Sequence, residues 1–325
     1  MMKFARARLG LPLLLAIALP TVSPSASAET GDATLPQAAG VYRFMIGDVR
    51  IIALSDGTAP QDYHTLLRGI TPAATDTALA REFEVNPVQT SVNVFLLEMA
   101  GRRVLIDTGT GDLFGPHTAG KLVSALKAAG VSPDQIDDIL ITHVHPDHVG
   151  GLVVGGEVVF SKAVVHFGQA DLAFFVDPPR AGEPHADAKT SAELVAMIKP
   201  YRDAGRIATF AAETTILPGL TATPYPGHTP GSAFYSLESR GQTIVFVGDI
   251  VHSGAVQFAD PGVTIMYDAL PDKARAVRQA AFARFARDRT LIAAPHLSFP
   301  GVGHVRAAGQ AYHWVPIEYA DWPSR

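Results

Sequence analysis

The stretch ITHVHPDHVGG (141–151) places four metal-ligand side chains within six consecutive positions. His143 and His145 are two residues apart at the end of an expected strand, so both imidazoles can leave the backbone on the same side. A proline then bends the chain, and Asp147 and His148 can point in another direction. One ion bound by three side chains would leave the fourth unused, whereas two ions would use all four. The spacing therefore favours a dinuclear metal site.

Three more candidate ligands follow strand-like segments far along the chain. His228 lies in the turn PGHTPG, Asp249 directly follows the apolar run IVFVG, and His296 follows LIAAP. Functional side chains at the C-terminal ends of strands are typical of open α/β sites. A carboxylate such as Asp249 can bridge two ions. We prefer His296 to the nearby His304 because His296 directly follows its strand.

The chain has no cysteine, so thiolate ligands and Cys nucleophiles are excluded and any metal site must use histidines and carboxylates. The Gly-x-Ser-x-Gly elbow, the Walker loop and the dinucleotide fingerprint are absent as well. Ligands of this kind suit Zn, Mn, Fe or Co alike. The remaining histidines are interpreted as surface or hydrogen-bonded structural residues: His64, His117, His166, His185, His252, His304 and His313.

Hydrophobic periodicity around these motifs predicts strands and helices in both halves of the chain. Hairpins are expected about Gly47-Asp48 and about residues 100–102. On the last helix, the arginines are expected to form a solvated outer face. Strands followed by flanking helices indicate an α/β sandwich with the sheets inside. Further strands are expected at 139–141, 163–167 and 290–294, and helices at 118–129, 168–175, 188–200 and 271–288, the last carrying Arg275, Arg278 and Arg287.

The N-terminus has the pattern of an export signal. A basic n-region and an apolar run at 11–20 precede the small-residue cleavage site Ala26-Ser27-Ala28. This run is shorter than the ~20 residues of a membrane span. We therefore expect a protein of the periplasm or the medium, with no membrane attachment after cleavage. The expected division is a signal peptide at 1–28, a flexible mature N-terminus at 29–40 and a single domain at 41–325.

The charge balance argues against a nucleic-acid partner. The net charge of the whole chain is −5, and removal of residues 1–28 leaves 23 basic and 31 acidic side chains, a net charge of −8. Such a mean field repels a phosphate backbone. The Pro-rich loop at 177–187 is expected to be a surface excursion, and the sequence leaves open whether it is a lid and whether the chain forms a homodimer.

Taken together, HVHPDH, GHTPGS and GDIVH resemble the metallo-β-lactamase superfamily, with the three motifs in family order. The resemblance implies a four-layer αββα sandwich and two divalent metal ions, with Zn expected first and Mn, Fe or Co as alternatives. It also implies that Asp107, in LIDTG, orients a ligand histidine. In the family pattern one ion takes His143, His145 and His228, the other takes Asp147, His148 and His296, and Asp249 bridges the two.

A narrower resemblance involves GDIVHSGAVQFADPGVTIMYD, AAPHLSFPGVGHV and WVPIEY. These segments are similar to the methyl parathion hydrolase-like branch of the superfamily, which contains exported dinuclear esterases, lactonases and phosphotriesterases. Phe114 and Phe175 stand near the positions where that branch places aromatic pocket residues. The second position often carries a larger indole in that branch, so Phe175 bears on the choice of substrate.

The expected activity is hydrolysis of a small-molecule ester by a metal-bridging hydroxide, with lactones or aryl esters first and phosphotriesters as a further substrate class. Asp249 holds the ions, and Asp147 can take a proton as the intermediate collapses. The rivals within the superfamily are a glyoxalase-II-type thioesterase, which would carry a helical C-terminal extension, a β-lactamase, in which Cys or Ser matches Asp249, and a nuclease. A non-catalytic zinc-binding protein is the rival from another class, and it would fill every coordination position.

Overall fold

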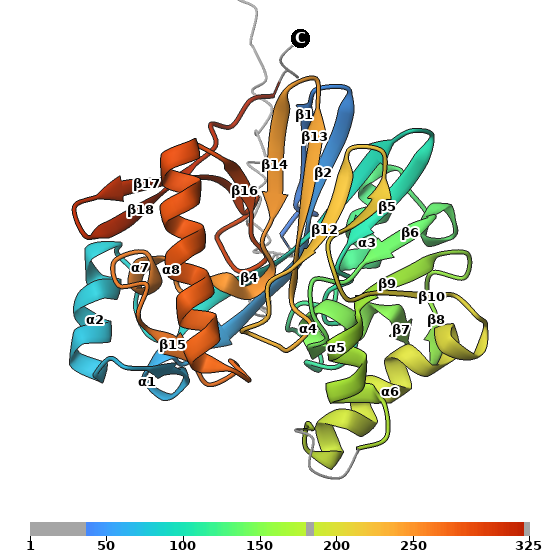
Figure 1. The fold of residues 1–325 in the computed structure, drawn as a ribbon, viewed down its shortest axis with the longest axis horizontal. Helices are drawn as coiled ribbons and strands as arrows, with labels where there is room; N and C mark the ends of the chain where they lie inside the picture. The colour runs from blue at the N-terminus through green and yellow to red at the C-terminus, as the bar shows by residue number, and fades with distance from the viewer. Residues whose placement is uncertain (1–36, 180–184, 322–325) are drawn as a thin grey trace, which may run out of the picture. The chain divides into compact units, whose positions relative to one another are not determined.

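The computed structural model describes residues 37–179 and 185–321 (Figure 1). Contacts along the chain place Ala39–Arg325 in one compact unit. The expected signal peptide and most of the expected flexible segment at 29–40 lie outside the described residues, as does the middle of the loop 177–187. In the described ranges, every helix is too short or too polar to cross a bilayer.

Two mixed seven-stranded sheets form the centre of this unit. The first has the order β1 (Val41–Ile46), β2 (Val49–Gln61), β4 (Val88–Met99), β5 (Arg102–Ile106), β6 (Asp138–Leu140), β9 (Val164–Gly168), β10 (Ile207–Phe210). The second has the order β11 (Thr214–Leu217), β12 (Leu220–Pro224), β13 (Ala233–Ser239), β14 (Gln242–Phe246), β16 (Leu291–Ala293), β17 (Val302–Ala308), β18 (Ala311–Pro316). Parallel pairs join β5 and β6, β6 and β9, and β9 and β10 in the first sheet, and β14 and β16 in the second.

Helices and short strand pairs connect and cover these sheets. Two small pairs are β3 (Leu67–Arg68) with β15 (Thr264–Ile265) and β7 (Val153–Val154) with β8 (Glu157–Val158). The α-helices are α1 (Tyr63–Leu66), α2 (Pro72–Arg81), α3 (Leu122–Ala129), α4 (Pro146–Val149), α5 (Gln169–Asp171), α6 (Ala188–Asp203), α7 (Gly254–Gln257) and α8 (Pro271–Asp288). A single π-helical turn, Leu172–Val176, follows α5.

Strand β2 shows why the apolar runs of the sequence are continuous rather than alternating. Ile52 and Leu54 belong to the core on the helix side of the first sheet, whereas Ile51 and Ala53 belong to the core between the two sheets. Because successive side chains of a strand point to opposite faces, a strand buried on both faces needs apolar residues at every position.

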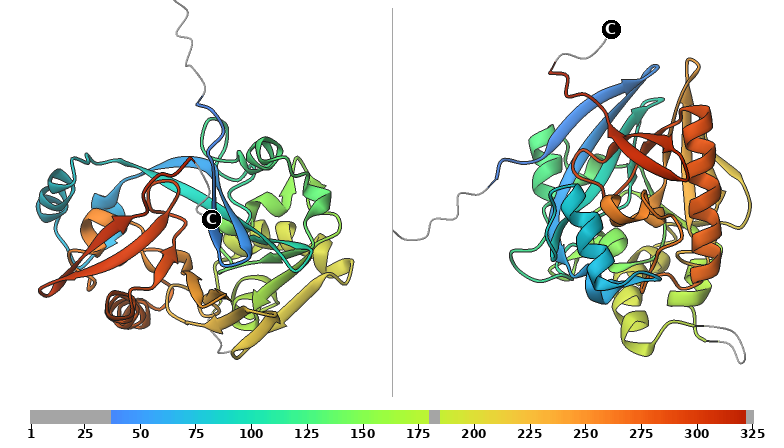
Figure 2. Two further views of the ribbon diagram at one scale, coloured as in Figure 1. Left: turned by 90° about the horizontal axis from the view of Figure 1, so that it is seen from above. Right: turned by 90° about the vertical axis from the view of Figure 1, so that its left-hand side faces the viewer.

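Helices α3 and α6 on one side and α8 on the other form the two outer layers of the unit (Figures 1 and 2). Leu126 of α3 and Ile198 of α6 join the core on the outer face of the first sheet. Phe282 and Phe285 of α8 join the core on the outer face of the second sheet. The predicted four-layer αββα sandwich is therefore confirmed.

The predicted hairpins are confirmed, whereas two of the predicted helices differ from those in the structure. Both hairpins form, with turns between β1 and β2 and between β4 and β5. The helix expected at 118–129 begins only at Leu122, because Ala119 and Gly120 have φ angles of 39° and 71° and cannot continue a right-handed helix. The helix expected at 168–175 divides into α5 and the π-helical turn.

Helix α8 has the expected bounds, but its arginines do not all lie on a solvated face. Arg278 is fully buried. Its guanidinium donates to the carbonyl oxygens of Ile250 and Val263 and faces the carboxylate of Asp268. A charge pattern alone cannot anticipate this, because the counter-charge lies outside the helix.

Candidate metal centre

The structure brings all seven predicted ligands together at one edge of the sandwich. They arrive from strand ends of both sheets, which explains why distant motifs can share a site. In the first sheet, the segment after β6 leads into α4, and in the second the ligands follow β12, β14 and β16. The first sheet thus supplies His143, His145, Asp147 and His148, and the second sheet supplies His228, Asp249 and His296.

Four of these residues form a first cluster, in which one ligand atom from each lies within 4.8 Å of the others: His143, His145, His228 and Asp249. The Nδ1 atom of His145 lies 3.1 Å from Nε2 of His143 and 3.0 Å from Nε2 of His228. Both of those Nε2 atoms lie 3.5 Å from Oδ2 of Asp249. Three imidazole nitrogens and one carboxylate oxygen thus point at a common centre.

The second cluster contains Asp147, His148, Asp249 and His296, with the same 4.8 Å limit between ligand atoms. Oδ1 of Asp249 lies 3.3 Å from Nε2 of His148, and Oδ2 lies 3.1 Å from Nε2 of His296. Asp147 Oδ2 lies 3.4 Å from the same His296 nitrogen. Asp249 is therefore common to both clusters.

The donor atoms of both clusters fit a pair of divalent cations. Nε2 of His148 and Oδ1 of Asp249 are buried and have no hydrogen-bond partner within the protein. Such orphaned polar atoms are costly unless a ligand satisfies them. The donors are nitrogen and oxygen atoms only, a set that suits Zn and also Mn, Fe or Co.

Electrostatics at the first cluster also favour a bound cation. Burial, followed by the proximity of His148, holds the pKa of His143 well below its usual range, and burial with His228 does the same for His145. Neutral imidazoles are the form that binds metal. Although burial opposes it, His148 and His296 hold the pKa of Asp249 well below the usual value, so its carboxylate is ionised. At the second cluster, although burial acts in the opposite direction, Asp249 raises the pKa of His148 and raises that of His296 to about 9, so a cation there must displace protons.

Asp107 supports the second cluster, as the resemblance implies. One of its oxygens, Oδ2, lies 2.9 Å from Nδ1 of His148 and accepts a hydrogen bond from the Thr142 hydroxyl at 2.8 Å. The other oxygen accepts from the Thr142 backbone N–H, also at 2.8 Å. This arrangement orients the His148 ring with Nε2 toward Asp249. Asp107 adopts φ of 62°, an uncommon conformation for a residue other than glycine.

Two further buried carboxylates support the first cluster, and sequence reasoning missed both. Asp268 Oδ1 lies 2.8 Å from Nδ1 of His228. Asp171 accepts hydrogen bonds from the Val144 N–H and the Thr229 hydroxyl, each at 2.8 Å, and so ties together the two loops that carry the ligands. No local pattern marks either residue, because each acts on a segment distant in sequence.

His252 lies in the site, contrary to its interpretation as a surface or hydrogen-bonded structural residue. It is buried, and its ring stacks on His296 with centroids 5.1 Å apart. Its Nε2 lies 3.1 Å from Oδ2 of Asp249, but neither ring nitrogen makes a hydrogen bond within the protein. The sequence held one signal for this residue, since His252 follows the candidate ligand Asp249 by three positions within the motif GDIVH.

The two predicted pocket aromatics differ in their surroundings. Phe175 is buried in the π-helical turn, and its ring meets the ring of His145 edge-on, with centroids 5.5 Å apart. Phe114 lies on the loop between β5 and α3 and is 36% exposed. His304, the alternative to His296, lies on β17 opposite Leu291.

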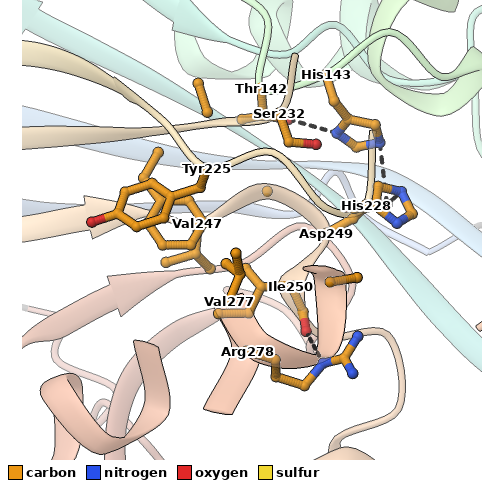
Figure 3. Close-up of a pocket in the computed structure, with 14 residues that line it drawn as sticks. Thr142, His143, Tyr225, His228, Ser232, Val247, Asp249, Ile250, Val277 and Arg278 are labelled. Atoms are coloured by element: carbon orange, nitrogen blue, oxygen red, sulfur yellow. Dashed lines mark hydrogen bonds and ion pairs between the residues drawn. The ribbon is translucent and has the colours of Figure 1, made fainter. Parts of the chain in front are cut away.

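Two cavities adjoin the clusters. A small one of about 20 Å³ lies beside His143 and His228 and extends toward α8 (Figure 3). A larger one of about 510 Å³ has His252 and His296 in its wall and is bounded further out by Arg81 of α2 and Trp314 of β18. The larger volume is in the range of small-molecule pockets.

The model of the metallo-beta-lactamase superfamily matches residues 88–296, a range that contains all seven ligands. The chain therefore belongs to this superfamily. With its clusters of metal ligands, it is a metal-dependent hydrolase.

Among solved structures, the chain is similar to a hydrolase described as AbOPH in the beta lactamase superfamily, with 38% identity, a TM-score of 0.82 and coverage of 88% of this chain and 100% of that one. AidC, a dizinc quorum-quenching lactonase, shares the fold at 23% identity and a TM-score of 0.80, covering 87% of this chain and 99% of AidC.

Curated relatives match a shorter part of the chain. Ribonuclease TTHA0252 of Thermus thermophilus is 29% identical over 184 residues, which are 53% of this chain but only 38% of the ribonuclease. The protein YobT of Bacillus subtilis is 29% identical over 184 residues, 54% of this chain and 71% of YobT. This chain therefore spans well under half of the ribonuclease.

Proposed function

We propose that this hydrolase binds two divalent metal ions and cleaves small lactones or aryl esters, with phosphotriesters as a further substrate class. We also place it in the methyl parathion hydrolase-like branch. The observation that carries the proposal is the carboxylate of Asp249, which is shared by two clusters of ligand atoms. An aspartate there fits a pair of ions, whereas the β-lactamases have Cys or Ser at the matching position.

The seven ligands would hold the ions in two groups that meet at Asp249. Ions bound there would activate water and polarise the oxygen of the scissile ester. Asp147 is the more accessible carboxylate of the site, with 17% of its side chain exposed against 3% for Asp249. It is therefore the group that can exchange a proton with the leaving oxygen.

An apolar, uncharged substrate is supported by the surroundings of the clusters. Phe175 covers the edge of His145 with an aromatic ring. We infer that Phe175 contacts the substrate and that Phe114 extends the same wall from its loop. The fold is shared with a lactonase, AidC, and the net charge of −8 expected after signal cleavage disfavours RNA as a substrate.

We also propose export, with the protein active in the periplasm or the medium. The support is the N-terminal pattern of a basic segment, an apolar run and a small-residue cleavage site. Cell fractionation with N-terminal sequencing tests this directly. A protein that starts at Met1 and stays in the cytoplasm would refute it.

The enzymatic proposal is tested by metal analysis of the purified protein combined with a turnover panel. The panel contains γ- and δ-lactones, an aryl ester, a phosphotriester, a thioester, a cephalosporin and a short RNA. We expect two metal equivalents per chain and the highest kcat/KM on a lactone or aryl ester. Preference for the thioester, the cephalosporin or RNA would refute the substrate class, and metal without any turnover would favour a non-catalytic zinc-binding protein.

A further inference from the structure

A buried carboxylate lies directly behind the metal ligand His228. Asp268 Oδ1 is 2.8 Å from His228 Nδ1, and the Asp268 side chain is fully buried. The main chain repeats the contact, since the Ala269 N–H donates to the His228 carbonyl oxygen at 2.8 Å and the Leu270 N–H donates to that of Gly227 at 3.1 Å. The segment 268–270 therefore holds the turn of His228 through one side chain and two backbone hydrogen bonds.

A buried arginine stands behind that carboxylate. Arg278 of α8 donates from Nε to the Ile250 carbonyl oxygen at 2.5 Å, a bond drawn in Figure 3, and from Nη1 to that of Val263 at 2.6 Å. Its Nη2 atom makes no hydrogen bond and lies 3.7 Å from Asp268 Oδ2. A buried guanidinium is costly without a counter-charge, and Asp268 provides it.

We propose that Asp268 and Arg278 are positioning residues that hold His228 in its Nδ1–H tautomer and thereby set the metal affinity of the first cluster. The inference rests on the proposed dinuclear site. With Nδ1–H donated to Asp268, the Nε2 lone pair faces the cluster, 3.5 Å from Oδ2 of Asp249. The Ile265 N–H, which donates to Asp268 Oδ2 at 3.1 Å, and the nearby Arg278 guanidinium keep the carboxylate in place. Rotating Asp268 away would break that hydrogen bond and leave the guanidinium without its counter-charge.

The second cluster offers an internal comparison. Asp107 plays the same part for His148, and its carboxylate accepts from the hydroxyl and the backbone N–H of Thr142. The two clusters are thus supported by different carboxylates, Asp268 behind His228 and Asp107 behind His148. Removing one support should weaken one cluster and spare the other.

The experiment titrates metal-free protein with Zn²⁺ against a competing chelating dye, in the wild type and in the variants Asp268→Asn and Asp107→Asn. Outer hydrogen bonds to a metal-ligating histidine are typically worth 10- to 100-fold in affinity. We expect Asp268→Asn to weaken one Zn²⁺ equivalent by about that factor, and Asp107→Asn to weaken the other. Unchanged affinities, or equal weakening of both equivalents by Asp268→Asn, would overturn the inference.

The tautomer itself is measured in the metal-free protein by ¹⁵N NMR of the histidine rings. We expect one Nδ1–H form of His228 in the wild type and a mixture in Asp268→Asn. Arg278→Met should shift the same ring signals, while Arg275→Met should not. Arg275 is the matched control because it donates to the same loop, at the Gly262 carbonyl oxygen, and pairs with Asp272.

A double-mutant cycle keeps the test decisive if Arg278→Met fails to fold. If Asp268 acts through His228, Asp268→Asn should change Zn²⁺ affinity in the wild type but not in a His228→Ala background. An equal effect in both backgrounds would refute the inference. Wild-type protein that binds no Zn²⁺ would instead refute the proposed function, so the two failures are distinguishable.

Discussion

The carboxylate of Asp171 accepts a hydrogen bond from the backbone N–H of Val144, 2.8 Å away, between the ligands His143 and His145. The same side chain accepts from the Gly231 N–H in the loop of His228. Burial raises the pKa of Asp171 to about 6, even though these hydrogen bonds act in the opposite direction. A group that holds three ligands in place is therefore easier to protonate in the folded chain.

This pKa predicts a specific pH dependence of stability. Because the folded pKa exceeds the unfolded value, the stabilising contribution of this group is complete below about pH 4 and is lost as the pH rises through 6. Between pH 4.5 and 7, the free energy of unfolding of the wild type should fall relative to that of Asp171→Asn by about 2 kcal/mol. Urea denaturation with chelator present measures this difference. A gap that is the same at both pH values would contradict it.

Replacing the shared carboxylate should stop catalysis without unfolding the protein. Asp249→Ala removes an oxygen donor from both clusters, and several kcal/mol of transition-state stabilisation correspond to a loss of about 10³-fold or more in kcat. Steady-state hydrolysis of the best substrate in the panel gives the loss, and far-UV circular dichroism reports the fold. Asp112→Ala, an exposed aspartate outside both clusters, is the control. Turnover near that of the wild type in Asp249→Ala would exclude the dinuclear mechanism.

Metal removal should lower thermal stability. The clusters bring five ligand histidines together with Asp147 and Asp249, so the folded state binds cations that the unfolded chain cannot gather. A ligand at 1,000 times its Kd stabilises a fold by about 4 kcal/mol. We expect a chelator to lower Tm by several degrees and added Zn²⁺ to restore it, as followed by scanning calorimetry. Identical melting curves with and without chelator would argue against a metal-binding fold.

The backbone of Gly151 lies so close to that of Thr108 that no side chain fits between them. A Cβ atom at this position would come within 2.0 Å of the Thr108 carbonyl oxygen. The neighbouring Thr108 N–H donates to the His148 carbonyl oxygen at 2.8 Å, so the clash would displace a metal ligand. We expect Gly151→Ala to cost about 3 kcal/mol of unfolding free energy.

Gly254→Ala is the matched control for that prediction. Its added Cβ would meet side chains rather than backbone, the end of Leu297 at 3.3 Å and the ring of Phe258 at 3.9 Å. Equal unfolding free energies for the two variants, measured in urea, would show that the contact at Thr108 is not limiting.

The sequence predicted the layers, and it located the seven residues that the structure gathers into two clusters of candidate ligands, but not the residues that support them. HVHPDH, His228, Asp249 and His296 follow apolar strands, so periodicity and spacing locate them. Asp268 acts on His228 across 40 positions and Asp171 acts on Val144 across 27, and such contacts arise only when separate elements pack. The solvated position predicted for Arg278 is wrong for the same reason, because its counter-charge, Asp268, and the carbonyl oxygens to which it donates lie outside its helix.

The distribution of the ligands between the two sheets has a mechanical consequence. Ions bound at this site would link the segment after β6 in the first sheet to segments after β12, β14 and β16 in the second. Such links would close long chain loops in the folded state, as disulfides do in many secreted proteins, yet this chain has no cysteine. The catalytic metal ions would then also cross-link the two sheets. Separating the sheets would therefore release the ions and abolish the active site in one step.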